Sequence, residues 1–190
     1  MAFSWNRALL DQLDFAWDDQ FTPRMVGLSD EEYFWEPVAG CWSVRPTRDG
    51  RYAMDVPAGR FERSAAPFTT IAWRLAHIAD VFGSRASNHF ADGAFSAADT
   101  DSPASADAAL VMVERDYRRW RTGVQALGED GLFRPCGPAE GPFSEEPLLT
   151  LVLHINREFL HHAAEVALLR DLYRDTVAKG SLTLNRPSLS

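Results

Sequence analysis

The chain has 190 residues, of which 46% are hydrophobic and 12% aromatic, so it is long and apolar enough to bury one core. Its formal net charge of −8 disfavours nucleic acid and anionic membranes as partners, because both attract concentrated positive charge. The chain has no uncharged apolar run of about 18 residues, and its start, MAFSWNRALLDQLDF, lacks the features of a secretory signal. The sequence therefore predicts a cytoplasmic protein without a membrane span.

The N-terminal part of the chain predicts a long helix over residues 4–25, which Pro23 is expected to kink or end. The expected inward face of this helix consists of Leu9, Leu10, Leu13, Trp17 and Phe21. A short helix should follow Ser29, because a serine followed by acidic residues is typical of a helix N-terminal cap. Pro37 should end that helix.

A long connection, residues 40–67, follows and is rich in Pro, Gly and Arg. A link of this length within one domain is usually functional or covers part of the core. We expect it to be ordered by the aromatic residues Trp42, Tyr52 and Phe61, with a small hairpin at Asp49–Gly50.

Three further long helices are predicted from apolar periodicity, over residues 67–90, 105–127 and 148–173. Pro67 suits the first turn of one of them, and Gly128 should end the next. The inward faces should carry Phe68, Ile71, Leu75, Ile78 and Phe82 in the first, and Leu110, Val113, Tyr117, Trp120 and Val124 in the second.

These elements predict an all-α fold, a four-helix bundle with a long ordered connection between its first two core helices. We expect a single domain over residues 1–175, a flexible tail over 176–190, and a solvated loop over 92–102. An exposed apolar face on such a bundle would favour a homodimer.

The last predicted helix carries Glu158 and His162 four residues apart, and residues at this spacing lie on the same helix face. On a helical wheel, His162 falls about 40° and Glu158 about 80° from the centre of the apolar stripe formed by Ile155, Phe159, Val166 and Tyr173. His161, about 140° away, should face outward or toward a neighbouring helix, and His154, about 120° away, lies at the border. An inward carboxylate is costly unless it is paired or bound to a cation.

Two explanations of the inward Glu158 stay open on spacing alone. It could form a buried salt bridge, with Arg74 or Arg85 as partner, beside an ordinary core histidine. Alternatively, Glu158 and His162 could hold a metal ion with a third ligand from another helix, for which His77 is the best candidate. His89, near the end of its helix, is expected at the surface. A ferritin-like di-iron centre is disfavoured, because it needs two Glu-x-x-His pairs.

Two other groups of residues have plain interpretations. The arginines Arg115, Arg118, Arg119 and Arg121 lie on one predicted helix and are better explained as its solvated flank than as a phosphate site. The two cysteines, Cys41 and Cys136, form no CxxC motif and are far apart, which gives no indication of a disulfide.

At these residues the chain resembles the DinB family, helical bundles that include bacterial thiol-dependent transferases and isomerases. The resemblance covers nearly the whole chain and rests on TTIAWRLAHIAD, HINREFLHHAAEVALLRDLY and the CWSVR segment. It implies a metal held by one His of the second core helix and two residues of the fourth, which by position are His77, Glu158 and His162. Many members have His where this chain has Glu158, and the His, Glu, His set is similar to that of mycothiol-dependent maleylpyruvate isomerases.

The resemblance implies a divalent metal, and two imidazoles with one carboxylate suit Zn²⁺, although Ni, Fe or Mn also fit. It further implies that a low-molecular-weight thiol, such as mycothiol or bacillithiol, is activated on the metal and attacks a small electrophile. His154 and His161 are candidates for the second shell. Trp42, Arg45 and Trp73 are candidates for the mouth of the substrate site. A non-catalytic metal-binding or stress-response protein, or a purely structural dimeric bundle, remains the alternative.

Overall fold

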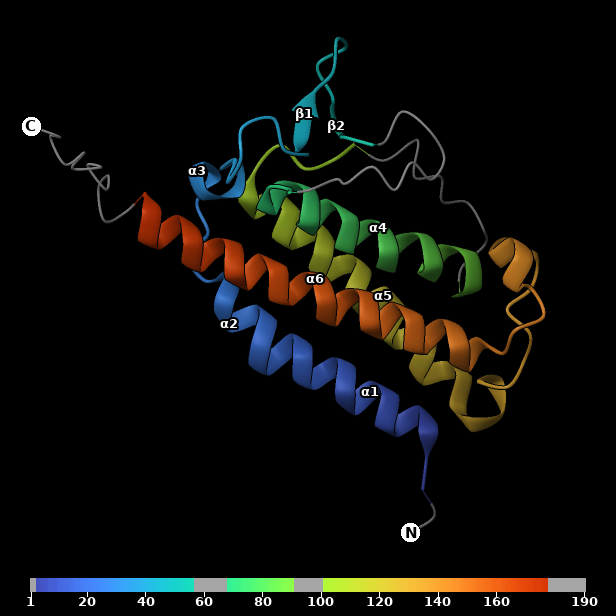
Figure 1. Cartoon of the computed structure of the whole chain (residues 1–190). Coiled ribbons are helices and arrows are strands. Elements are labelled where there is room, and N and C mark those ends of the chain that lie inside the picture. Colours follow the sequence, from blue (N-terminus) through green and yellow to red (C-terminus); the bar gives the residue numbers. More distant parts are fainter. Residues whose placement is uncertain (1–2, 57–67, 91–100, 178–190) are drawn as a thin grey trace, which may run out of the picture.

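The computed structural model describes residues 3–56, 68–90 and 101–177, and these are predominantly helical, as predicted. Among them, four long helical segments lie side by side (Figure 1). The helix α4 (Ile71–Phe90) packs along both α5 (Ala106–Gly131) and α6 (Leu148–Thr176), while α1 (Trp5–Phe15) packs on α5 and α6 from the other side. The buried apolar side chains between these segments form one continuous core.

The first segment has the predicted extent but a different internal geometry. Its parts are α1, a π-helical stretch at Ala16–Phe21, and α2 (Thr22–Met25). The side chain of Ser4 accepts a hydrogen bond from the backbone N–H of Arg7 and so caps α1. Pro23 lies in the first turn of α2, after the π-helical stretch, where its missing N–H is best tolerated.

The boundaries of the later helices differ from the predictions by a few residues. Helix α4 begins at Ile71, and Phe68, which was predicted to face inward, is 49% exposed. Pro67, the predicted start, lies outside the described residues. Helix α5 continues to Gly131, but its backbone loses helical geometry at Gly128, where φ is +59°, so the regular helix ends where the glycine predicted.

The connection between α2 and α4 contains the two predicted small elements. Ser29 caps the short helix α3 (Asp30–Tyr33) by accepting from the N–H of Glu32, and α3 ends before Pro37. The strands β1 (Val44–Pro46) and β2 (Tyr52–Met54) form an antiparallel hairpin with Val44 opposite Met54. Figure 1 places this hairpin at one end of the helices, beside the start of α4.

Several predictions concern residues that lie wholly or partly outside the described ranges. Phe61 lies outside them, and so does most of the predicted loop over 92–102. The predicted tail over 176–190 is described only to residue 177, and Thr176 still belongs to α6. No helix within the described ranges combines the length and the apolar character that crossing a bilayer requires.

The two cysteines and the arginine cluster are placed as the sequence suggested. Cys41 and Cys136 are both free thiols. The guanidinium groups of the cluster pair with carboxylates: Arg115 and Arg119 with Asp116, Arg118 with Glu114, and Arg121 with Asp14. The cluster therefore has little uncompensated charge to offer a phosphate.

Candidate metal centre

Helices α4 and α6 bring the three predicted ligands together. One donor atom from each of His77, Glu158 and His162 lies within 4.8 Å of the other two. The rings of His77 and His162 are 4.7 Å apart between centroids and nearly perpendicular, at 82°. Glu158 Oε2 lies 3.5 Å from His162 Nε2. The donors therefore converge from two separate helices on one point.

The arrangement follows from the apolar pattern of α6. Ile155 and Phe159 are each 1% exposed, which fixes the face that α6 turns toward the core. His162 lies on this face and is 7% exposed, whereas the side chain of Glu158, at the edge of the face, is 27% exposed. One donor is thus buried, and another remains within reach of a solute.

A carboxylate that the sequence interpretation missed orients His162. Glu165, one turn further along α6, lies 2.7 Å from His162 Nδ1. Glu165 also pairs with Arg74 Nε at 3.0 Å, and its pKa stays below the usual value because these contacts outweigh the effect of burial. An ionised Glu165 accepts the Nδ1–H of His162, so Nε2 carries the lone pair and faces Glu158.

Arg74 competes with Glu165 for the same nitrogen of His162. Its Nη1 lies 3.3 Å from Nδ1 and, because a guanidinium only donates, could bond there only to an unprotonated Nδ1, whereas the shorter contact with Glu165, at 2.7 Å, favours the Nδ1–H form. The guanidinium is therefore held by Glu165, and by the ring of Trp73, whose centroid is 5.0 Å away. A search of the sequence at three-residue spacing from His162 and His77 would have found both Glu165 and Arg74.

His77 is kept neutral by its surroundings. Burial, and then the neighbouring His162, lower the pKa of His77 to about 4. The imidazole is therefore uncharged at neutral pH and has the free lone pair that a metal ligand needs. Two imidazoles and one carboxylate are a donor set that fits a divalent cation such as Zn²⁺.

A second group of donors, formed by His161, His162 and Glu165, has similar spacing. All three residues come from α6, and the side chain of His161 is 64% exposed. A cation there would lie against the guanidinium of Arg74 and would take the nitrogen of His162 that Glu165 already holds. The group that includes His77 is therefore the better metal centre.

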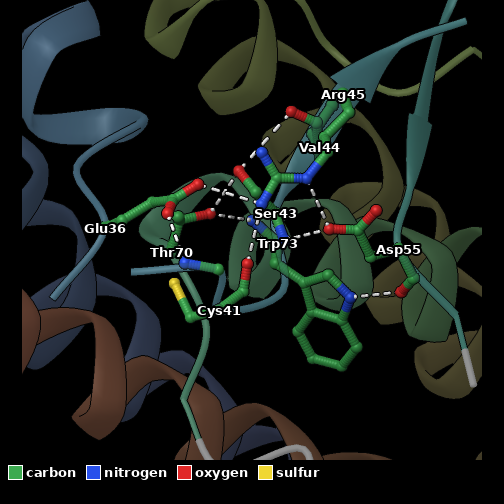
Figure 2. Close-up of polar contacts among 9 residues, drawn as sticks. Glu36, Cys41, Ser43, Val44, Arg45, Asp55, Thr70 and Trp73 are labelled. Atoms are coloured by element: carbon green, nitrogen blue, oxygen red, sulfur yellow. Dashed lines mark hydrogen bonds and ion pairs between the residues drawn. The ribbon is translucent and has the colours of Figure 1, made fainter. Parts of the chain in front are cut away.

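Two of the three residues predicted for the mouth of the site, Trp42 and Trp73, lie in a row with His77. The Trp73 ring stacks on His77 at 5.1 Å and 19°, and Trp42 lies 5.7 Å from Trp73. Figure 2 shows that Arg45 turns instead to Glu36 and Asp55, each 2.9 Å away, and to the carbonyl of Cys41. Arg45 thus joins the hairpin to the segment after α3.

The same figure shows how the hairpin is attached to α4. Trp73 Nε1 donates to the carbonyl of Asp55 at 2.8 Å, and the hydroxyls of Ser43 and Thr70 are 3.0 Å apart (Figure 2). The indole that stacks on His77 is therefore itself held by the hairpin.

Of the remaining histidines, His161 faces outward as predicted, His154 lies at the border where the wheel left it, and His89 departs from its prediction. His161 is exposed, and the side chain of His154 is 42% exposed, with Nδ1 lying 3.6 Å from Glu158 Oε1. The prediction that His89 is at the surface was wrong: its side chain is 5% exposed, and its Nε2 lies 2.9 Å from Glu140. The segment Pro138–Phe143 covers the end of α4, which a wheel of α4 alone could not show.

The alternative partners proposed for Glu158 are engaged elsewhere. Arg74 pairs with Glu165, and Arg85 pairs with Glu140 at 3.1 Å. The arginine nearest to Glu158 is Arg157, at 3.9 Å, whose side chain is 71% exposed. Neither Arg74 nor Arg85 therefore forms the buried salt bridge that spacing alone had left open.

A helical fold with a His, Glu, His donor set on two neighbouring helices defines a class of candidate metalloproteins. The sequence model of the DinB superfamily matches residues 12–166, and the chain belongs to this superfamily. The match includes α4 and all three donors. Comparison with curated proteins finds no match, and neither does comparison with solved structures.

Proposed function

We propose that this chain is a DinB-type metalloenzyme, a four-helix bundle in which His77, Glu158 and His162 hold one divalent ion, most suitably Zn²⁺. The convergence of their donor atoms within 4.8 Å carries this proposal. The proposed reaction joins a low-molecular-weight thiol to a small electrophile, or isomerises that electrophile through the thiol. A bound ion would act as a Lewis acid that lowers the pKa of a coordinated thiol or water.

The protein side chains have separate tasks in this scheme. Glu165 holds the Nδ1–H of His162 and so keeps its Nε2 available. Trp73 fixes the plane of the His77 ring and shields it from solvent. His154, which is partly exposed and lies beside Glu158, is placed to exchange protons between the site and water.

Metal content tests the donor set. The purified protein is expected to carry about one ion per chain after tag removal, and Glu158→Ala and His162→Ala should lose it, because three ligands are the minimum of such a site. His154→Ala and His161→Ala are matched controls on the same helix and should keep the ion. The measurement is elemental analysis, with circular dichroism to confirm that each variant is folded.

Turnover tests the reaction separately. Thiol-dependent consumption of an electrophile should be seen with the wild-type protein and lost in His162→Ala. A protein that binds the ion but turns over no thiol and electrophile pair would be a non-catalytic metal-binding protein. A folded protein that binds no ion would contradict the proposed centre.

A further inference from the structure

The outer side of α6 carries a stripe of exposed apolar side chains. In Figure 1 this helix lies between α4 and α1, on the near side of the molecule. Leu153 is 49% exposed, Leu168 is 59% exposed, and Ala164 between them is also exposed. Single exposed leucines are ordinary on a soluble protein, but apolar side chains aligned on one helix face indicate a contact surface.

The centre of this stripe follows a regular spacing around Ala164. At about 100° per residue, seven residues fall about 20° short of two full turns, so Arg157 and Asp171 both lie within about 20° of Ala164. Leu160 and Leu168, four residues to either side, lie about 40° away. These five positions share one side of the helix, and we call them the Ala164 face.

The Ala164 face is complementary to itself. When two copies of α6 pack antiparallel about a two-fold axis at Ala164, each residue meets the one that lies equally far beyond the axis. Arg157 then meets Asp171 of the partner subunit, and Leu160 meets Leu168 of the partner subunit. The symmetry produces each contact twice, so two leucine pairs are flanked by two ion pairs of opposite charge.

The charged groups at the two ends of the face are accessible. The side chain of Arg157 is 71% exposed, and the nearest carboxylate, Glu158, is 3.9 Å away, beyond hydrogen-bond distance. One terminal nitrogen of Arg157 lies 2.6 Å from His154 Nδ1, and a guanidinium has further N–H groups to donate. Asp171 is 61% exposed and pairs with Arg24 at 2.5 Å, and a carboxylate accepts from more than one donor.

We propose that the Ala164 face joins two copies of this chain through antiparallel packing of their α6 helices. The symmetry of the pattern favours a second copy as the occupant, because a surface for a different protein need not repeat its charges in reverse about its own centre. A two-fold contact of this kind closes on itself and gives a dimer instead of a filament. The proposal uses neither the metal nor the reaction, so it is tested independently of the proposed function.

The small side chain at the axis makes the contact testable by cross-linking. Packed helix axes are about 8–10 Å apart and each Cα lies about 2.3 Å from its axis, so two facing Cα atoms are separated by about 3.4–5.4 Å. This range overlaps the Cα separation of about 4.4–6.8 Å that a disulfide requires. A cysteine introduced at Ala164 should therefore bond to its symmetry mate.

Charge reversal tests the pairing across the axis. Sedimentation equilibrium of the purified full-length chain should show a dimer, and Arg157→Asp and Asp171→Arg should each raise its Kd at least about tenfold, because each places like charges opposite each other twice. The variant with both changes restores opposite charges and should return the Kd to within about threefold of the wild-type value. Glu114→Arg and Arg118→Asp, at an exposed ion pair of α5, are the matched controls and should leave the Kd unchanged.

Cysteine cross-linking tests the position of the axis. Under mild oxidation Ala164→Cys should form a disulfide-linked dimer, seen on a non-reducing gel. Ala126→Cys, at an exposed alanine of α5, is the control and should not form one. The native thiols of Cys41 and Cys136 are only 4% and 9% exposed, so they should contribute little to cross-linking.

Two results would overturn the proposal. One is a wild-type chain that stays monomeric at the highest concentration measured. The other is a dimer whose Kd is unchanged by the single charge reversals and whose Ala164→Cys variant forms no cross-link, since its contact would then lie on another face. Circular dichroism confirms that each variant is folded before it is compared.

Discussion

At the scale of single residues, the central feature is that the two nitrogens of His162 have different partners. Nδ1 meets Glu165 at 2.7 Å, and Nε2 faces Glu158 at 3.5 Å. A carboxylate behind an imidazole fixes the ring orientation and raises its basicity. In the proposed metal centre, Glu165 would therefore position His162.

Removing this carboxylate should weaken metal binding without abolishing it. Glu165→Ala is expected to lower the affinity about 10–100-fold, and Glu165→Gln should recover part of the loss because its amide oxygen still accepts from Nδ1–H. Competition with a chelator of known affinity measures the effect. Asp171→Asn, at an exposed acid of the same helix, is the control, and an unchanged affinity in Glu165→Ala would refute the role.

The burial of a single residue can be predicted well from the sequence when it depends only on the face of the residue's own helix. The wheel of α6 puts His162 within the apolar arc, Glu158 at its edge, His154 at the border and His161 outside, and side-chain exposure in the structure rises in the same order. The surface position predicted for His89 was wrong because Glu140, on a segment distant in sequence, packs against it. The direction of Arg45 likewise depends on Glu36 and Asp55, which no local pattern links to it.

At the scale of elements, α4 and α5 approach each other closely at Gly123. A Cβ placed on this residue would lie 1.9 Å from Cδ2 of the Phe90 ring, at the end of α4. The ring therefore occupies the space that a side chain would take. A glycine within an otherwise regular helix costs helix stability, and here it permits the contact.

Substituting Gly123 should consequently destabilise the protein. Gly123→Ala is expected to lower the free energy of unfolding by about 1–3 kcal/mol. Displacing the overpacked Phe90 ring costs more free energy than the helix gains from replacing glycine with alanine. Denaturant unfolding followed by circular dichroism measures the change. Thr122→Ala, at the exposed neighbouring position, should stay within about 0.5 kcal/mol, and a stabilised Gly123→Ala would contradict the close contact.

The elements themselves were mostly accessible from the sequence. Apolar periodicity located the four long helical segments, and Ser29 and Gly128 marked a start and an end by their capping chemistry. The start of α4 was placed too early because Pro67 resembles a first-turn residue. The π-helical stretch before Pro23 has no sequence signature of comparable strength.

At the scale of the whole molecule, one buried ion pair joins the last helix to the segment after the first. Arg170 of α6 is 0% exposed and makes two hydrogen bonds to Glu32 of α3, at 2.6 and 2.9 Å. It also donates to the carbonyls of Arg24 and Val26 at the end of α2. Local patterns carry no information about such distant pairs, and the sequence interpretation did not find this one.

Breaking this pair should destabilise the whole fold. Arg170→Met is expected to cost about 3–5 kcal/mol, because it leaves the Glu32 carboxylate buried without its partner. Replacing both residues, as in Glu32→Leu with Arg170→Met, should recover much of this loss. Arg118→Met, which breaks the exposed pair with Glu114, is the control at about 0.5 kcal/mol or less. Thermal unfolding compares the variants, and equal effects at the two sites would refute the argument.

The contact between the hairpin and α4 has a consequence for how the donors respond to distant change. Asp55 holds the indole of Trp73, and that indole lies flat on the His77 imidazole. A displacement of β2 is thereby transmitted through one rigid ring to a donor atom. Asp55, directly after the second strand, is thus mechanically coupled to the tilt of the His77 ring.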